Sequence, residues 1–231
     1  MALSIPKTKN ESDWSTKQSI IIAIINFAIG TIVFLFAYFS VHYDLGINSV
    51  NQPLLAWIID NRNPQITSIM QIITEITNPY ILVALAITIS VIWAIKKREI
   101  IRPILFITAL GISTISFTMV KLITENNRPP ADSMILPLEI DFSFPSGHAI
   151  SIFVGLLILG YLINSRRSSF GKNFIWITVT IIATVLTSAS RLYLGYHWAT
   201  DIIGSIGLGL VILAVIIFID KFISYKFKSL K

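Results

Sequence analysis

The sequence contains no cysteine and few charged residues for its length. None of its 231 residues is a cysteine, which excludes disulfide bonds, thiolate metal sites and cysteine nucleophiles. Charged residues make up 13% of the chain, about half of the roughly 25% usual in soluble domains. Apolar residues make up 54%, and the mean hydropathy is +0.76. The composition excludes a soluble globular domain and predicts a chain that lies largely in lipid.

Six uncharged stretches approach the roughly 20 residues that a helix needs to cross a bilayer. They predict an all-α, polytopic membrane protein with six transmembrane helices. Three stretches are only 18 residues long, so we expect their helices to extend into flanking residues or to hold a charged end in a polar cavity. The stretches lie within residues 18–43, 76–95, 103–120, 142–165, 173–190 and 202–219.

Lysine and arginine are unevenly distributed over the two sides that six crossings define. If the N-terminus is cytoplasmic, 14 of the 18 cations fall on the cytoplasmic side, in keeping with the known bias of membrane proteins. We therefore predict cytoplasmic N- and C-termini, and we interpret the net charge of +6 as a sign of membrane orientation rather than of nucleic acid binding. The other four cations, all three histidines and eight of the twelve acids map to the outer side. Those four cations are Arg62, Lys121, Arg128 and Arg191.

The segment 45–78 is neither a membrane span nor a typical linker. Its apolar residues cluster at helical spacing, which favours a pair of short interfacial or re-entrant helices. The segment could instead cap a polar site, but we favour packing at the membrane surface. Asn78-Pro79 predicts the break before the second span. Without a repeat or linker, the chain is predicted to be one domain, residues 1–231.

The first outer cluster follows the third span and contains Lys121 and Arg128. As a structural feature, Lys121 would extend towards the membrane surface and Arg128 would pair with Glu125 or a lipid headgroup. As a functional feature, the two cations would clamp an anion, with Pro129 and Pro130 stiffening the chain after Arg128.

The second cluster, residues 144–149, precedes the fourth span. Ser146 is expected to cap a helix, and Gly147 would let a ligand approach the backbone. With His148 in the first turn, this helix start has the donors of a phosphate site, although an ordinary capped helix fits as well.

The third cluster joins the fifth span to the sixth and contains Arg191, His197 and Asp201. If the sixth helix begins near Tyr196, His197 and Asp201 lie on one face within hydrogen-bond reach. The carboxylate would then fix the tautomer of the imidazole, as in catalytic triads. A purely structural His–Asp contact between helix ends is the alternative.

The outer groups fit an anion better than a metal ion, because three cations beside two histidines repel a divalent ion. A phosphoryl group in its transition state needs donors to its equatorial oxygens. These are available from Lys121, Arg128, Arg191 and Ser146 with nearby backbone N–H groups. We expect His197, oriented by Asp201, to attack phosphorus and His148 to protonate the leaving oxygen.

The three clusters together resemble the signature motifs of the type 2 phosphatidic acid phosphatase superfamily. Six residues separate Lys121 from Arg128-Pro129, residues 145–148 read Pro-Ser-Gly-His, and five residues separate Ser190-Arg191 from His197, with Asp201 after three more. The resemblance implies a phosphatase/haloperoxidase-like helical core and a metal-independent membrane lipid phosphatase with a phosphohistidine intermediate and no cofactor. The hydropathy excludes the soluble haloperoxidase branch.

The resemblance implies several lipid phosphates as substrates. We expect undecaprenyl pyrophosphate or phosphatidylglycerophosphate first, with phosphatidate as a further candidate, all drawn from the bilayer. The alternative is a membrane protein that binds or transports anionic lipids without turnover. A transporter would have helices broken in mid-membrane, whereas the polar groups here lie at span ends.

Overall fold

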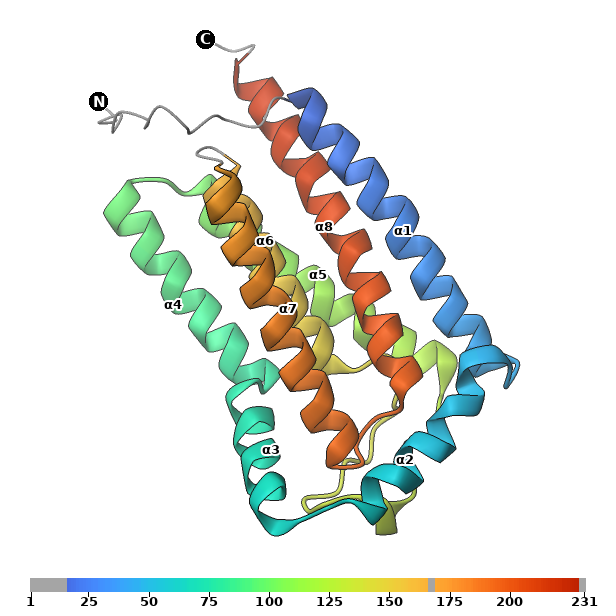
Figure 1. The fold of residues 1–231 in the computed structure, drawn as a ribbon. Coiled ribbons are helices and arrows are strands. Elements are labelled where there is room, and N and C mark those ends of the chain that lie inside the picture. Colours follow the sequence, from blue (N-terminus) through green and yellow to red (C-terminus); the bar gives the residue numbers. More distant parts are fainter. Residues whose placement is uncertain (1–15, 166–168, 229–231) are drawn as a thin grey trace.

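The computed structural model describes residues 16–165 and 169–228, which form helices joined by loops (Figure 1). Within these ranges, six helices are long and apolar enough to cross a membrane, which confirms the all-α, six-span prediction. These are α1 (Thr16–His42), α4 (Pro79–Lys97), α5 (Ile101–Thr124), α6 (Gly147–Asn164), α7 (Phe170–Tyr193) and α8 (Ala199–Lys228). The shorter helices are η1 (Gly46–Val50), α2 (Asn51–Asp60), α3 (Pro64–Ile76) and η2 (Ala131–Ser133).

The helices build the bundle around α6. In the most apolar window of α6, 61% of the residues are buried, against 17% in α1 and 11% in α4. The core is formed mainly by α5, α6 and α8, while the apolar faces of α1 and α4 remain exposed, as expected of surfaces that meet lipid. Helices α1 and α8 pack closely along their length, and a Cβ at Gly207 would come within 2.4 Å of the Phe34 backbone nitrogen. Only glycine allows this close approach of two helices.

The two ends of the bundle contain different parts of the chain. Figure 1 places the start of α1 and the end of α8 at one end, and α2 and α3 at the other, which we call the site end. The loop from α5 to α6 and the turn from α7 to α8 also reach the site end. Of the 14 cations assigned to the cytoplasmic side, Lys7, Lys9, Arg166, Arg167 and Lys231 lie outside the described residues.

All three short spans extend as expected, the third within α8 (Ala199–Lys228). Helix α5 continues through Lys121 to Thr124, and α7 continues through Arg191 to Tyr193, so each buries a cation at its site end. The helix of the fourth stretch begins at Gly147, directly after Ser146, as the predicted cap requires. The side chain of Ser146 accepts a hydrogen bond from the Ala149 amide and caps the helix at that point.

Segment 45–78 forms short helices, as predicted, but it contacts the other helices more than membrane-surface packing requires. Helix α3 packs against α7, and α2 contacts α7 as well. The side chain of Asn51, at the start of α2, donates to Thr200 Oγ1 over 3.0 Å. The segment therefore packs over the site end, which agrees with the alternative of a cap rather than with packing at the membrane surface alone. The predicted break is confirmed, since α4 begins at Pro79 with Asn78 as its cap.

Candidate active site

A cavity of about 890 Å³ joins the faces of α4 and α5 to the polar groups at the site end. Its apolar wall includes Ile87 and Ile115, which are 49% and 66% exposed on the sides of their helices. Its polar end brings together five residues that the sequence singled out: Lys121, Arg128, Gly147, His148 and His197. The cavity thus runs from the lateral, apolar surface of the bundle to a cluster of cations and histidines.

His197 and Asp201 form the predicted pair, although not on one helix. Helix α8 begins at Ala199, so His197 lies in the preceding turn and Asp201 in the first turn of the helix. Imidazole Nδ1 is 3.1 Å from Asp201 Oδ2, which also accepts the Trp198 backbone N–H over 2.8 Å. The carboxylate therefore favours the tautomer with a proton on Nδ1. The other ring nitrogen, Nε2, then carries no proton and accepts a hydrogen bond from Arg128 Nη1 over 3.3 Å, and His197 lines the cavity.

The environment of His197 keeps its ring neutral. The side chain is 1% exposed, and burial together with the charges of Arg128 and Arg191 holds the pKa of the His197 imidazole well below its ordinary value of 6.5. A neutral ring with Nδ1 protonated leaves a lone pair on Nε2, which is the form that a nucleophile needs.

Two acids that the sequence analysis did not single out connect the three predicted cations. Glu139 pairs with Arg191 through one carboxylate oxygen and with Arg128 through the other, the latter over 2.7 Å. Asp141 pairs with both Arg128 and Lys121. Burial alone would raise the pKa of the Asp141 carboxyl, but the hydrogen bond from Lys121 and the charge of Arg128 hold it below its usual value. Among the described residues, the acidic partners of Arg128 are therefore these two and not Glu125.

Arg191 is the most deeply buried of the three cations. Its side chain is 1% exposed, and Nη1 donates to Thr74 Oγ1 of α3 over 2.7 Å. Its guanidinium lies 4.4 Å from the centre of the Tyr196 ring. Arg191 does not line the cavity itself and reaches the cluster through Glu139.

The start of α6 contributes Gly147 and His148 to the cavity wall, but not Ser146. Ser146 is fully buried, and its hydroxyl oxygen accepts the Ala149 N–H as the helix cap. The structure therefore places His148 beside the phosphate-binding candidates and gives Ser146 the role of shaping the helix start. The free backbone N–H groups of this first turn belong to the same end of the helix.

Ser143 is a second polar contact that the sequence did not reveal. This fully buried side chain donates to Asp201 Oδ2 and lies 3.4 Å from His197 Nδ1. Its backbone N–H donates to the carbonyl of Asn126 over 2.8 Å. The adjoining carbonyl of Asn127 accepts from the indole of Trp198 over 2.8 Å. These bonds connect the first sequence cluster to the third, and Ser143 itself directly precedes the second.

The assembled groups have the parts of a phosphoryl-transfer site. An imidazole oriented by a carboxylate lies beside an arginine, a lysine and a second imidazole. Such donors stabilise charge on the equatorial oxygens of a phosphoryl group in transfer. The six spans are each continuous helices, with the polar groups at their ends, unlike the interrupted helices of many transporters.

Comparisons with known proteins agree with this assembly. The family model of the PAP2 superfamily matches residues 102–223. An undecaprenyl-diphosphatase of Sulfolobus acidocaldarius is 26% identical over 159 residues, covering 69% of this chain and 73% of that protein. Phosphatidylglycerophosphatase B of Bacillus subtilis is 29% identical over 153 residues, covering 65% and 73%.

A crystal structure shows a similar fold. The transmembrane PAP2-type phosphatidylglycerolphosphate phosphatase from Bacillus subtilis matches with a TM-score of 0.73 at 24% identity. The match covers 83% of this chain and 96% of that one. The likeness therefore extends over most of the chain.

Proposed function

This chain belongs to the PAP2 superfamily and is a membrane phosphatase, and from that premise we propose that it hydrolyses the terminal phosphate of a membrane lipid. Undecaprenyl pyrophosphate and phosphatidylglycerophosphate are the first candidates, and phosphatidate is the third. Relatives named for the first two reactions support this choice.

The cavity carries the proposal. A lipid could keep its chains against the apolar faces of α4 and α5 while its phosphate reaches Arg128 and His197. A substrate free in water would have no use for an apolar wall that opens on the side of the bundle. The site would face the extracytoplasmic side, since the charge distribution favours cytoplasmic termini.

In the proposed mechanism, His197 Nε2 attacks phosphorus and the bond to the leaving oxygen breaks. The negative charge of the bound phosphate offsets the nearby cations and lets His148 hold a proton, which it donates to that oxygen. The alcohol or lipid phosphate departs and a phosphohistidine remains. His148 then takes a proton from water, whose oxygen attacks phosphorus and releases inorganic phosphate and neutral His197. Lys121, Arg128 and Arg191 would stabilise the negative charge in both steps, so we propose that no metal is needed.

Phosphate release from purified protein tests the function. We expect release from at least one of the three lipids, unchanged by EDTA and inhibited by vanadate. His197→Ala should lose nearly all turnover and should also lose the acid-labile phosphate that quenched wild-type protein retains. Lipid binding without phosphate release would instead support the non-catalytic alternative, and wild-type activity in His197→Ala would remove His197 as the nucleophile.

A further inference from the structure

The acids that pair with the three site cations carry a further inference. Lys121 and Arg128 line the cavity with Arg191 behind them, and Glu139 and Asp141 form ion pairs with these three cations. Arg128 Nη2 contacts both carboxylates, so a phosphate cannot form a charge-assisted bond to this nitrogen until both acids have moved. Substrate binding is therefore an exchange of one anion for others.

The segment that carries the acids is built for such an exchange. Glu139 and Asp141 turn towards the cations, while Ile140 between them is 98% exposed and Leu138 is 47% exposed. The side chains alternate as in an extended strand, with acids on one face and apolar residues on the other. The carboxylates are 26% and 60% exposed, far more than the arginine side chains that they contact, so the acids have room to move and the cations do not.

Charge balance determines which anion can replace the acids. Three cations and two carboxylates leave one net positive charge. A phosphomonoester carries a charge of about −1.5 to −2 at neutral pH, so it can displace both carboxylates and keep this balance. A phosphodiester carries a single charge, and if it displaced both acids it would leave two positive charges uncompensated in a mostly buried site, at a high electrostatic cost.

We propose that Glu139 and Asp141 determine specificity by competing with phosphodiester lipids for the three site cations. This proposal rests on the function proposed above. It adds discrimination against phosphodiester lipids, which the site needs in a bilayer. Ordinary anionic phospholipids are phosphodiesters that present the same apolar chains to the cavity and greatly outnumber any substrate. Without the competing acids, the cations would bind these lipids unproductively. Terminal phosphates and pyrophosphates are selected because only they replace the charge of both acids.

Inhibition by phosphatidylglycerol in mixed micelles tests the proposal. The variants are Glu139→Gln, Asp141→Asn and their combination, and the control is Asp132→Asn, which removes an exposed acid from the same loop. We expect the inhibition constant of phosphatidylglycerol to fall by about tenfold or more in the double variant, because charge-assisted bonds no longer compete. The KM for the lipid phosphate should fall by a smaller factor, and the Asp132→Asn variant should behave as wild type.

Binding measurements keep the test decisive if the double variant is inactive. Spin-labelled phosphatidylglycerol is titrated into His197→Ala protein with and without the two acid substitutions. Tighter binding in the triple variant supports the proposal, whereas equal binding overturns it, as would equal inhibition constants in active protein. Absence of phosphate release from wild type would refute the proposed phosphatase function and leave this binding comparison valid.

Discussion

At the scale of single residues, the neutral state of His197 makes a direct prediction. Because its folded pKa lies below 6.5, His197 should not show the imidazole titration near pH 6.5 that an unfolded chain shows. Below that pH the unfolded chain binds more protons than the folded one, so acid should destabilise the fold through this group.

Nitrogen NMR of histidine-labelled protein in detergent measures this titration. The His197 signal is identified by its loss in His197→Gln, and the acid-unfolded protein serves as the reference. We expect His197 of the folded protein to keep the shifts of a neutral ring with a proton on Nδ1. A His197 midpoint at or above about 6.5 would show that water reaches the ring and that the cations do not act on it.

Ser143 offers a second prediction at the residue scale. Ser143→Ala removes one donor from the Asp201 carboxylate but no group from the cavity wall. We expect kcat to fall by about tenfold or more, since hydrogen bonds to charged groups contribute about 1.5–3 kcal/mol, with KM little changed. Ser133→Ala is the matched control, because this buried serine of the same loop donates only to the Pro130 carbonyl. Equal kcat values in the two variants would contradict the role of Ser143 in orienting the pair.

At the scale of helices and loops, the sequence predicts the features that depend on hydrophobic stretches and on the spacing of motifs. Uncharged stretches locate all six spans, and the three motifs provide both the His197–Asp201 pair and the cations. The pattern could not provide Glu139 and Asp141, because acids on the outer side are numerous and only the folded loop shows which ones meet Arg128. The clustering of these acids just before the Pro-Ser-Gly-His motif was the available signal.

Long-range contacts between side chains were equally hidden. Thr74 supports Arg191 across 117 positions of sequence, and nothing in the spacing of α3 distinguishes it from any other threonine at a helix surface. The start of α8 was misplaced for a related reason. The pattern allowed a helix from Tyr196, whereas Asp201 accepts the Trp198 amide and caps a helix that starts at Ala199.

The cavity wall on α5 gives a prediction for lipid binding. A Cβ at Gly111 would meet no atom within 4 Å, so Gly111→Phe should fold while its ring enters the cavity. Turnover of a long-chain lipid phosphate should fall by about tenfold or more, because the ring takes space from the lipid chains and misplaces the phosphate. Turnover of a short-chain, water-soluble phosphate ester should change little.

The control for this variant is Gly171→Phe. Gly171 also has open space around its Cα, but it is exposed near the start of α7 and does not line the cavity. If both substrates lost turnover equally in Gly111→Phe, the ring would be disturbing the fold, and the cavity would not be the binding site of the chains.

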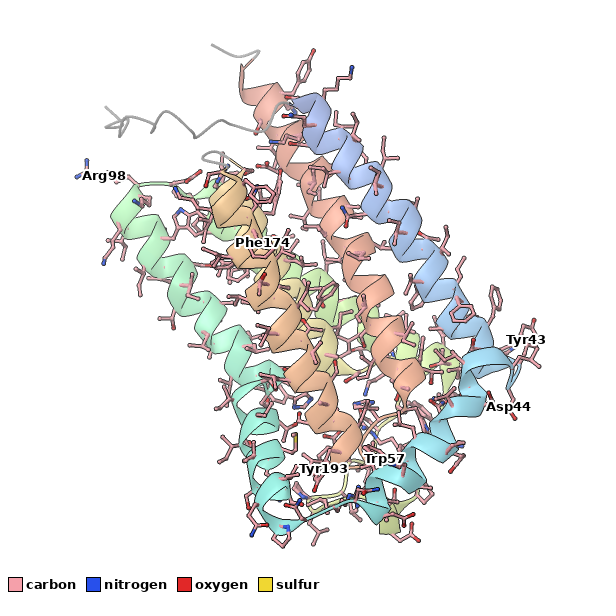
Figure 2. All side chains as sticks on the ribbon, viewed as in Figure 1. Tyr43, Asp44, Trp57, Arg98, Phe174 and Tyr193 are labelled. Carbon is pink, nitrogen blue, oxygen red and sulfur yellow. The ribbon has the colours of Figure 1, made fainter. Side chains whose placement is uncertain are left out.

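At the scale of the whole molecule, orientation in the membrane is the property to test. Asp44 and Arg98 lie at opposite ends of the bundle (Figure 2). Both residues are exposed, and both have a positive φ, 53° and 49°. Because the chain lacks cysteine, Asp44→Cys and Arg98→Cys make a matched pair of single labelling sites.

We expect a membrane-impermeant thiol reagent to label Asp44→Cys in intact cells and to label Arg98→Cys only after the membrane is opened. This result would place the site end on the extracytoplasmic side, as the cation distribution predicts. The reverse pattern would move the reaction to the cytoplasmic leaflet and leave the chemistry of the site unchanged.

The cavity binds the lipid chains and the phosphate with different parts of the protein, so selection can act on chain preference and on phosphate chemistry independently. Helix α4 supplies Tyr80, Val83 and Ile87 to the apolar wall, but it supplies none of the ion pairs at the site. It also lies wholly before residue 102, where the match to the superfamily begins. Substitutions on α4 can therefore change which lipid chains fit without altering phosphate chemistry. Related enzymes would be expected to diverge in lipid preference first along this helix, while their motifs stay the same.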